Sequence, residues 1–217
     1  MYKLFYFPGN ANLAPHMTLE EIGAPYRLEF VDRAVNAQKS AAYLALNPTG
    51  RIPVLVDGGL VLYETAAICL HLADRHPEAQ LAPPLGSDER AHFYKWLAWL
   101  TNTLQAELIT YFYPERLTDD AAATAQVNAH AEARIMEMID LAEAQLARNA
   151  AAQAGPWLLG AQYTVLDPYL MMLCRWTRMM GNPARNRKHV GKFLDAMWAR
   201  PAVQRAFDQE GLKAPLY

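Results

Sequence analysis

The segment NPTGRIPVL, residues 47–55, places a proline directly before an apolar run, and YETAAI follows it at residues 63–68. Proline donates no ladder hydrogen bond, so we expect Pro53 at a strand start, a sheet edge or a bulge. An X-Pro bond favours trans by only roughly 0.5–1 kcal/mol, which allows a fold to hold the Ile52–Pro53 bond in the cis form. Ile52 would then present its backbone N–H and C=O groups to an extended ligand such as a peptide.

Glu64 and Thr65 stand where a predicted strand gives way to a predicted helix, because residues 66–72 carry apolar side chains at three- and four-residue spacing. A hydroxyl and free backbone N–H groups at a helix N-terminus attract a carboxylate, and a neighbouring glutamate can pair with an ammonium group. We therefore expect an anion site with an ammonium site beside it. The structural alternative is that Glu64 is only a solvated acid at a helix start, where acids are favoured.

The order of the elements predicts an α/β domain followed by an all-α domain. Strands are expected near residues 2–7 and 26–31 with a helix near 16–22 between them, which makes a βαβ unit. A short helix and a strand hairpin around Asp57-Gly58-Gly59 follow, and a helix over residues 65–76 closes the domain. The expected boundaries are 1–77 for the α/β domain, 78–87 for a proline-rich linker and 88–217 for the all-α domain, with helices near 88–113, 122–149, 165–180, 187–198 and 201–209.

Composition excludes several classes of protein. The net charge is −2 and no basic run occurs, so the chain lacks the electrostatic footprint of a nucleic-acid or anionic-membrane partner. The N-terminus lacks the features of a signal peptide, which predicts a cytoplasmic protein. Cys69 and Cys174 lie in separate apolar helical runs and are expected to be buried thiols, neither a disulfide nor part of a metal site.

Thr164 and Asp167 precede the most apolar helical window and predict a capping box. Thr164 would accept a hydrogen bond from the backbone of residue 167, and Asp167 would reach back to residue 164. This pair is expected to serve folding and not chemistry.

Taken in order, these features resemble the cytosolic glutathione S-transferases over nearly the whole chain. The bacterial beta class is the most similar group on the basis of further short motifs: Leu4 to Gly9, His16, Asn47-Pro48, Gly50, Arg200-Pro201 and Glu210 to Lys213. The resemblance implies a thioredoxin-like N-terminal domain and a C-terminal helical bundle. It also implies a homodimer that uses glutathione as co-substrate, with no metal, and activates its thiol toward an electrophile held mainly by the helical domain.

The chain departs from the beta-class pattern at its expected reactive positions. Ala11 stands where that class carries a cysteine, and Asn10 stands where serine-using classes place a hydroxyl. The remaining candidates for stabilising a thiolate are therefore Tyr6, Asn10 and Asn12, helped by the backbone N–H groups of Ala11 and Asn12. The alternatives are that Tyr6 is a core aromatic residue, that the asparagines only shape a turn, and that His16 is structural and not a catalytic base.

The other glutathione contacts follow from the resemblance. Glutathione would lie beside the Ile52-Pro53 turn, with Glu64 and Thr65 at its γ-glutamyl end and Ala11 among its contacts. Gln38, Lys39 and Arg51 are candidates for the glycine carboxylate.

The electrophile site is expected in the helical domain. Ala98, Asn102 and Gln105 are spaced to share one face of a helix, where the beta class carries an asparagine at the first position and a histidine at the last. Asn102 and Gln105 would orient the thiol, a water or the substrate, while apolar surface would come from Trp99, Tyr111 and Phe112.

Two rival functions remain open at this point. One is a non-catalytic binding module of the same fold, which the changes at Ala11 and Gln105 favour. The other retains catalysis but uses glutathione for isomerisation or peroxide reduction.

Overall fold

The computed structural model describes residues 1–217, which form two compact units by their internal contacts. The first unit begins with β1 (Tyr2–Tyr6), α1 (Leu13–Ile22) and β2 (Tyr26–Phe30). β1 and β2 pair in parallel, with Tyr2 opposite Tyr26, so the predicted βαβ unit is confirmed. α1 begins three residues before the expected start at residue 16, because Pro15 lies in the first turn, where no intrahelical N–H bond is lost.

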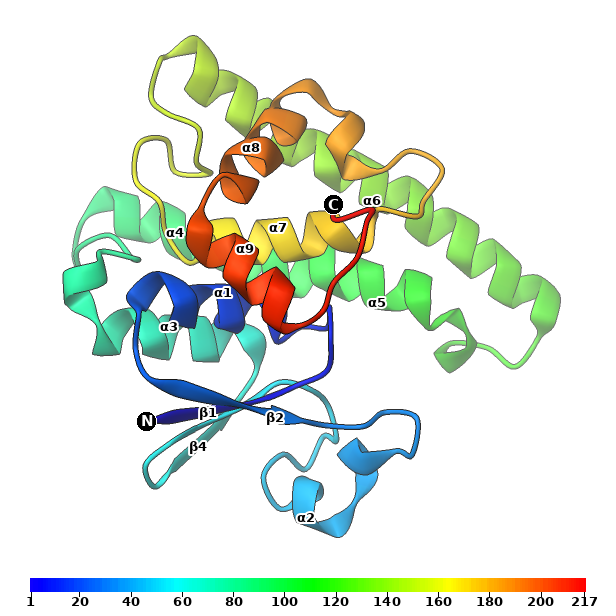
Figure 1. Ribbon diagram of the computed structural model, residues 1–217. Helices are drawn as coiled ribbons and strands as arrows, with labels where there is room; N and C mark the ends of the chain where they lie inside the picture. Colours follow the sequence, from blue (N-terminus) through cyan, green and yellow to red (C-terminus); the bar gives the residue numbers. More distant parts are fainter. The chain divides into compact units, whose positions relative to one another are not determined.

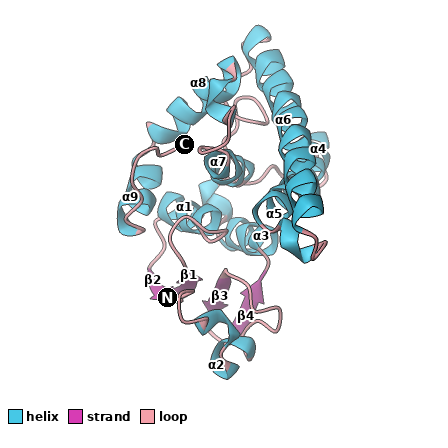
Figure 2. Cartoon of the chain, turned by 90° about the vertical axis from the view of Figure 1, so that its right-hand side faces the viewer, coloured by secondary structure: helices cyan, strands magenta, loops and turns pink.

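The predicted hairpin completes a four-stranded sheet in the order β2-β1-β3-β4. β3 (Val54–Asp57) is antiparallel to both β1 and β4 (Leu60–Tyr63). Figure 2 shows α1 and α3 (Thr65–Arg75) on one side of the sheet and α2 (Ala41–Leu44) on the other. Two apolar clusters match these layers: Leu4, Leu19 and Ile68 belong to the first, and Tyr43 and Val54 to the second. The expected thioredoxin-like domain is present.

The second unit is helical, as predicted. Its α-helices are α4 (Asp88–Trp99), α5 (Ala106–Phe112), α6 (Ala121–Ala151), α7 (Leu166–Trp176) and α8 (Lys188–Trp198), and α8 runs two residues past the end of the unit. α6 is the long green helix of Figure 1. Its alanine-rich sequence favours helix locally, and the side chain of Asp120 caps it by accepting from Ala123 N–H. Every residue of α7 is buried, so this helix forms the core of the unit. Short helical turns occur in both units. The first unit contains η1 (Ala37–Lys39) and η2 (Pro77–Ala79), and the second contains η4 (Pro114–Arg116) and η5 (Ala184–Asn186).

The two units divide the chain differently from the expected domains. Residues 1–82 and 197–214 form the first unit, and residues 83–196 and 215–217 form the second. The change near residue 82 lies inside the expected linker, but α9 (Pro201–Gln209) packs against α1 and belongs with the sheet. Sequence alone shows that residues 201–209 are helical and amphipathic, and not which core receives their apolar face.

The capping arrangement before α7 forms with one change of partner. Asp167 Oδ2 accepts from Thr164 N–H at 2.8 Å, as expected. The hydroxyl of Thr164 accepts from Leu166 N–H at 3.3 Å, while Asp167 N–H donates to the Thr164 carbonyl at 3.0 Å. Asp167 also accepts from Leu158 N–H at 2.9 Å, so one buried carboxylate joins the preceding loop to the helix start.

Candidate glutathione site

Strand pairing brings three predicted segments to one edge of the sheet. β1 ends where β3 begins, since Phe5 pairs with Val54, and Val54 in turn pairs with Tyr63 at the end of β4. Tyr6, Pro53 and Glu64 each come directly next to these paired positions. The register therefore gathers the end of β1, the Ile52–Pro53 bond and the start of α3 in one place.

The backbone at Ile52 is available for hydrogen bonding. The Ile52–Pro53 bond is cis, as the sequence suggested. Pairing of β3 with β1 starts at Val54, and the N–H and C=O groups of Ile52 take part in no backbone hydrogen bond of the protein. The preceding carbonyl of Arg51 is already occupied, because Tyr43 Oη and Asn47 Nδ2 donate to it at 2.9 and 2.7 Å. These two hydrogen bonds fix the turn through the Arg51 carbonyl and leave the backbone N–H and C=O groups of Ile52 unpaired.

The start of α3 has the features of a preformed anion site. Glu64 has φ of 74° and ψ of 115°, a conformation that is strained for a residue other than glycine, and it gives no side-chain cap. No acidic residue occupies the first turn, so the first N–H groups of the helix have no side-chain partner. Thr65 is buried, and its hydroxyl donates to the Ala11 carbonyl at 3.2 Å. This bond joins the start of α3 to the loop before α1.

That loop is held by a buried carboxylate about 200 residues further along the chain. Glu210 Oε2 accepts from Gly9 N–H at 2.7 Å, and its Oε1 accepts from Asn12 Nδ2 at 2.8 Å. Asn12 Oδ1 accepts from Phe7 N–H at 3.1 Å, and His16 Nδ1 lies 2.8 Å from Glu210 Oε1. The side chains of His16 and Glu210 have no exposed surface. We call this set, Gly9, Asn12, His16 and Glu210, the Glu210 network.

His16 also connects this network to the surface of the first unit. Its Nε2 lies 2.9 Å from the hydroxyl of Tyr26, which donates to Glu20. Burial and the nearby carboxylate of Glu20 raise the pKa of Tyr26, so its hydroxyl stays protonated at neutral pH. Arg205 from α9 pairs with Glu20 at 2.6 Å. Both ring nitrogens of His16 contact protein groups, which fits a structural role for this residue and not a role as catalytic base.

The three predicted thiolate donors lie in different environments. Asn12 has no exposed surface and its amide donates to Glu210, which favours a structural role in this conformation. Asn10 is partly exposed, and its Oδ1 accepts from Ala11 N–H at 2.8 Å. That bond uses the Ala11 N–H group and leaves the Asn10 amide NH₂ as a donor. Burial, and next the negative charge of Glu210, raise the pKa of Tyr6, so its hydroxyl remains a neutral donor.

Lys39 and Arg51 are exposed near the same turn. Lys39 Nζ donates to the Thr49 carbonyl at 3.3 Å and lies against Gly50, where an added Cβ would come within 2.6 Å of it. Gly50 has φ of 60°, so glycine suits this position both for its backbone and for the contact with the lysine.

In the helical unit, the segment that carries Asn102 and Gln105 departs from the regular α-helix assumed for the face of Ala98, Asn102 and Gln105. Residues Leu100–Gln105, labelled η3, form a π-helix between α4 and α5. Its wider turn changes the angular spacing of side chains. Ala98 and Asn102 are exposed, whereas Gln105 is half-buried and accepts a hydrogen bond from Tyr169 of α7.

The predicted aromatic residues are largely engaged with neighbours in their own unit. Trp99 meets Trp96 edge-on at 5.2 Å between ring centroids, and Tyr111 meets Phe112 at 5.2 Å. Phe112 also meets Trp176 at 6.3 Å and remains 43% exposed, so it is the most accessible apolar candidate.

Sequence reasoning missed the role of Glu210. The motif around Glu210 contributed to the resemblance, but a burial-dependent pairing with His16 leaves no local signal in a single sequence. No group of three or more His, Cys, Asp or Glu residues is arranged to hold a metal ion. No helix is both long enough and apolar enough to span a membrane.

Comparison with known proteins identifies the family. Residues 1–74 match the model of the glutathione S-transferase N-terminal domain. Glutathione S-transferase GstA of Escherichia coli O157:H7 is 32% identical over 97% of this chain and 100% of its own length. A sphingomonad glutathione S-transferase complexed with glutathione superposes with a TM-score of 0.82 at 30% identity, covering 97% of this chain and 100% of that one. A glutathione transferase homologue from Lodderomyces elongisporus with two glutathione molecules per subunit has a TM-score of 0.82 at 25% identity, covering 96% and 98%. The predicted resemblance is confirmed, and the chain belongs to the glutathione S-transferase family.

Proposed function

We propose that this protein is a glutathione S-transferase that binds glutathione at the sheet edge formed by Tyr6, Ile52 and Thr65. Two features that occur together carry the proposal. The N–H and C=O groups of Ile52 are unused by the protein, and the start of α3 has no side-chain cap. An extended γ-glutamyl tripeptide offers complementary groups for both. Glutathione is bound in the sphingomonad relative, which supports the assignment.

Each part of glutathione has a proposed partner. The N–H and C=O groups of Ile52 pair with the cysteinyl backbone, while Pro53 and Ala11 border it. The γ-glutamyl carboxylate accepts from the first N–H groups of α3 and from the Thr65 hydroxyl, which rotates away from the Ala11 carbonyl to donate. Glu64 pairs with the ammonium group, and the exposed Lys39 and Arg51 attract the glycine carboxylate.

The chemical step is attack by the glutathione sulfur on a soft electrophile. The thiol proton leaves to solvent, the S–C bond forms, and the electron pair moves to the acceptor or its leaving group. A free thiol with a pKa of about 8.5 is mostly protonated at neutral pH, so hydrogen-bond donors must favour the thiolate. Tyr6 Oη and the Asn10 amide are the proposed donors, because both remain unbonded by protein acceptors and partly exposed. Asn12 supports the loop through Glu210.

The electrophile is proposed to bind on the helical unit. Phe112, Trp99 and Tyr111 supply apolar surface, and Asn102 and Gln105 supply polar groups. The proposal includes a homodimer, as implied by the resemblance.

A thiolate titration tests the proposal. Thiolate absorbance of glutathione bound to the purified protein is followed against pH by ultraviolet difference spectroscopy. A bound-thiol pKa at least one unit below that of free glutathione is expected. Saturable binding with an unshifted pKa would instead indicate a non-catalytic binding module, and absence of binding would contradict the site.

A second candidate, peroxide reduction, is favoured by a specific observation. The Lodderomyces relative holds two glutathione molecules per subunit, and in this chain Cys69 and Cys174 are buried with pKa values raised by burial to about 12. Because both cysteines of the protein are buried thiols, the two electrons would come from glutathione. Two glutathione thiols supply both electrons and both protons, and an organic hydroperoxide is converted to an alcohol and water while glutathione disulfide forms. A rate that depends on the second power of glutathione concentration below saturation would support this reaction over transfer.

A further inference from the structure

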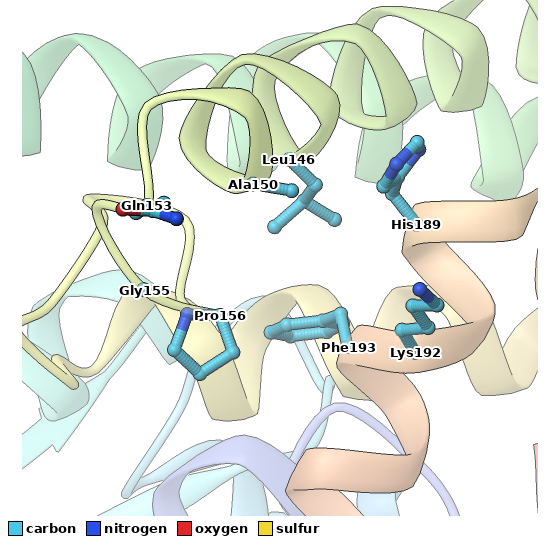
Figure 3. A pocket seen from close by; sticks show the side chains of 8 residues that line it. All are labelled: Leu146, Ala150, Gln153, Gly155, Pro156, His189, Lys192 and Phe193. Atoms are coloured by element: carbon cyan, nitrogen blue, oxygen red, sulfur yellow. The ribbon is translucent and has the colours of Figure 1, made fainter.

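A separate cavity lies within the helical unit. It has a volume of about 330 Å³ and opens between the last turns of α6, the loop that follows it and the first turns of α8. This volume is at the lower end of the range of small-molecule sites. Figure 3 shows Leu146 and Ala150 facing Phe193 and Pro156 across the cavity. None of these residues belongs to the proposed glutathione or electrophile sites.

The walls of this cavity are held in place by several independent contacts. Asn149 Nδ2 donates to the carbonyls of Trp157 and Leu158 at 2.8 and 3.2 Å, which ties the loop to α6. Gly155 has φ of 110°, and an added Cβ would come within 2.7 Å of the Gly160 carbonyl, so the loop turns tightly there. Phe193 packs edge-on against Trp157 at 6.5 Å between centroids. The cavity is therefore preformed.

The polar groups at one end of the cavity are basic. His189 and Lys192 are three residues apart on α8, and Figure 3 places both at the same end. No carboxylate lines the cavity. The nearby carboxylate of Glu143 is already occupied, since it accepts from His189 Nδ1 at 2.7 Å and from the backbone N–H groups of His189 and Val190 at 2.8 Å each.

These contacts also orient the ring of His189. Nδ1–H donates to the Glu143 carboxylate, so it is Nε2–H of the imidazolium form that can donate to a ligand carboxylate. Lys192 is exposed and carries a flexible ammonium group. A ligand that fills the apolar part of the cavity would bring an acidic group to these two side chains.

We propose that this cavity binds a small amphipathic acid, with an aromatic or aliphatic body against Leu146, Pro156 and Phe193 and a carboxylate at Lys192 and His189. A neutral apolar molecule would fill the same space but leave the basic end without a partner. The site is independent of the proposed glutathione chemistry, because every residue that forms it lies within the helical unit.

Isothermal titration calorimetry with two probes of the same shape tests this site. The probes are 4-phenylbutyrate and its neutral isostere 4-phenylbutanamide, each titrated at low ionic strength into the full-length protein. S-Methylglutathione is present at saturation, or at the highest soluble concentration if it does not bind. We expect the carboxylate to bind about two- to fivefold more tightly than the amide, the range of a partly exposed ion pair.

Two variants locate the binding. Ala150→Phe fills the cavity from an exposed helix position and is expected to weaken 4-phenylbutyrate at least tenfold, whereas the neighbouring Ala151→Phe, which does not line the cavity, leaves it unchanged. Lys192→Gln removes the preference for the carboxylate, while Lys188→Gln, one turn earlier and outside the cavity, preserves it. Both lysines are exposed, so these variants fold.

Three results would overturn the proposal: no binding of 4-phenylbutyrate, equal affinities of the two probes, or undiminished affinity in Ala150→Phe. Failure of the glutathione proposal would appear separately, as absent S-methylglutathione binding with the cavity responses intact.

Discussion

The loop before α1 and the segment around Ile52 and Glu64 border the proposed glutathione site, and their polar groups differ in whether the protein already bonds to them. In the loop, Gly9 N–H and the Asn12 amide both donate hydrogen bonds to Glu210. At the other border, the backbone of Ile52 and the first N–H groups of α3 are left without protein partners. The first border is fixed by internal hydrogen bonds, and the second keeps backbone groups with which a ligand could pair. The backbone groups that the protein has not used are therefore the first candidates for binding a ligand.

The largest effect is expected when the supporting border is broken. Glu210→Ala leaves His16, Asn12 and Gly9 without their shared acceptor in a fully buried position. Removing one partner of a buried pair costs about 3–5 kcal/mol, which corresponds to a fall in Tm of roughly 10 °C for a chain of this size.

Thermal and urea unfolding measure this change. Glu210→Gln, which keeps an acceptor oxygen and the side-chain shape, is expected to recover part of the loss. If Glu210→Ala unfolds like the wild type, the Glu210 network does not support the loop.

A smaller effect is expected at the binding border. Thr65→Ala removes the hydroxyl proposed to donate to the γ-glutamyl carboxylate, and hydrogen bonds to charged groups contribute about 1.5–3 kcal/mol. Glutathione affinity measured by calorimetry should fall at least tenfold. Thr65→Ser, which keeps the hydroxyl, should bind nearly as well as the wild type. Undiminished affinity in Thr65→Ala would remove Thr65 from the site.

The donors between the two borders are expected to have a moderate effect on the thiol. Tyr6→Phe and Asn10→Ala should each raise the pKa of bound glutathione by up to about one unit, since a neutral hydrogen bond contributes about 0.5–1.5 kcal/mol and one pKa unit corresponds to about 1.4 kcal/mol.

Tyr2→Phe is the matched control, because Tyr2 lies on the same strand and bonds to His76 at 3.0 Å away from the site. An unchanged pKa in one variant removes that donor from the proposed mechanism, and an unchanged pKa in both removes the mechanism.

The smallest effect is expected outside both borders, at the start of α8. Burial raises the pKa of Glu143, but hydrogen bonds from Val190 and His189 outweigh it and leave the pKa below its usual value. A lowered folded-state pKa contributes stability above the unfolded value of about 4.3, and that stability is lost as pH falls through the folded-state pKa.

Glu143→Gln should therefore be less stable than the wild type by about 1 kcal/mol at pH 7, the typical contribution of a helix cap, and the difference should shrink below about pH 4. Urea unfolding across this pH range measures it. A difference that stays constant with pH would show that the carboxylate charge has no part in the cap.

The elements of the first unit were predictable because their signals are local. A proline before an apolar run, an Asp-Gly-Gly turn and a glycine after an apolar helix each restrict the backbone within a few residues. The same holds for Thr164 and Asp167, which are three residues apart, although their second hydrogen bond goes to Leu166.

The helical face near residue 100 was less predictable for a physical reason. Helical periodicity assumes regular turns, and the π-helix at Leu100–Gln105 interrupts them, so Gln105 turns toward Tyr169. No residue type in LTNTLQ marks such an interruption.

The sequence by itself determined the order of the elements, the position of Pro53, the helix start after Glu64 and the family. Only the tertiary structure decided that α9 joins the sheet unit and that Glu210 holds the loop before α1. It also decided that Asn12 is buried while Asn10 keeps a free amide. The reason is that burial and pairing between residues 200 positions apart depend on how separate elements pack, whereas propensities and turns act through the few residues next to them.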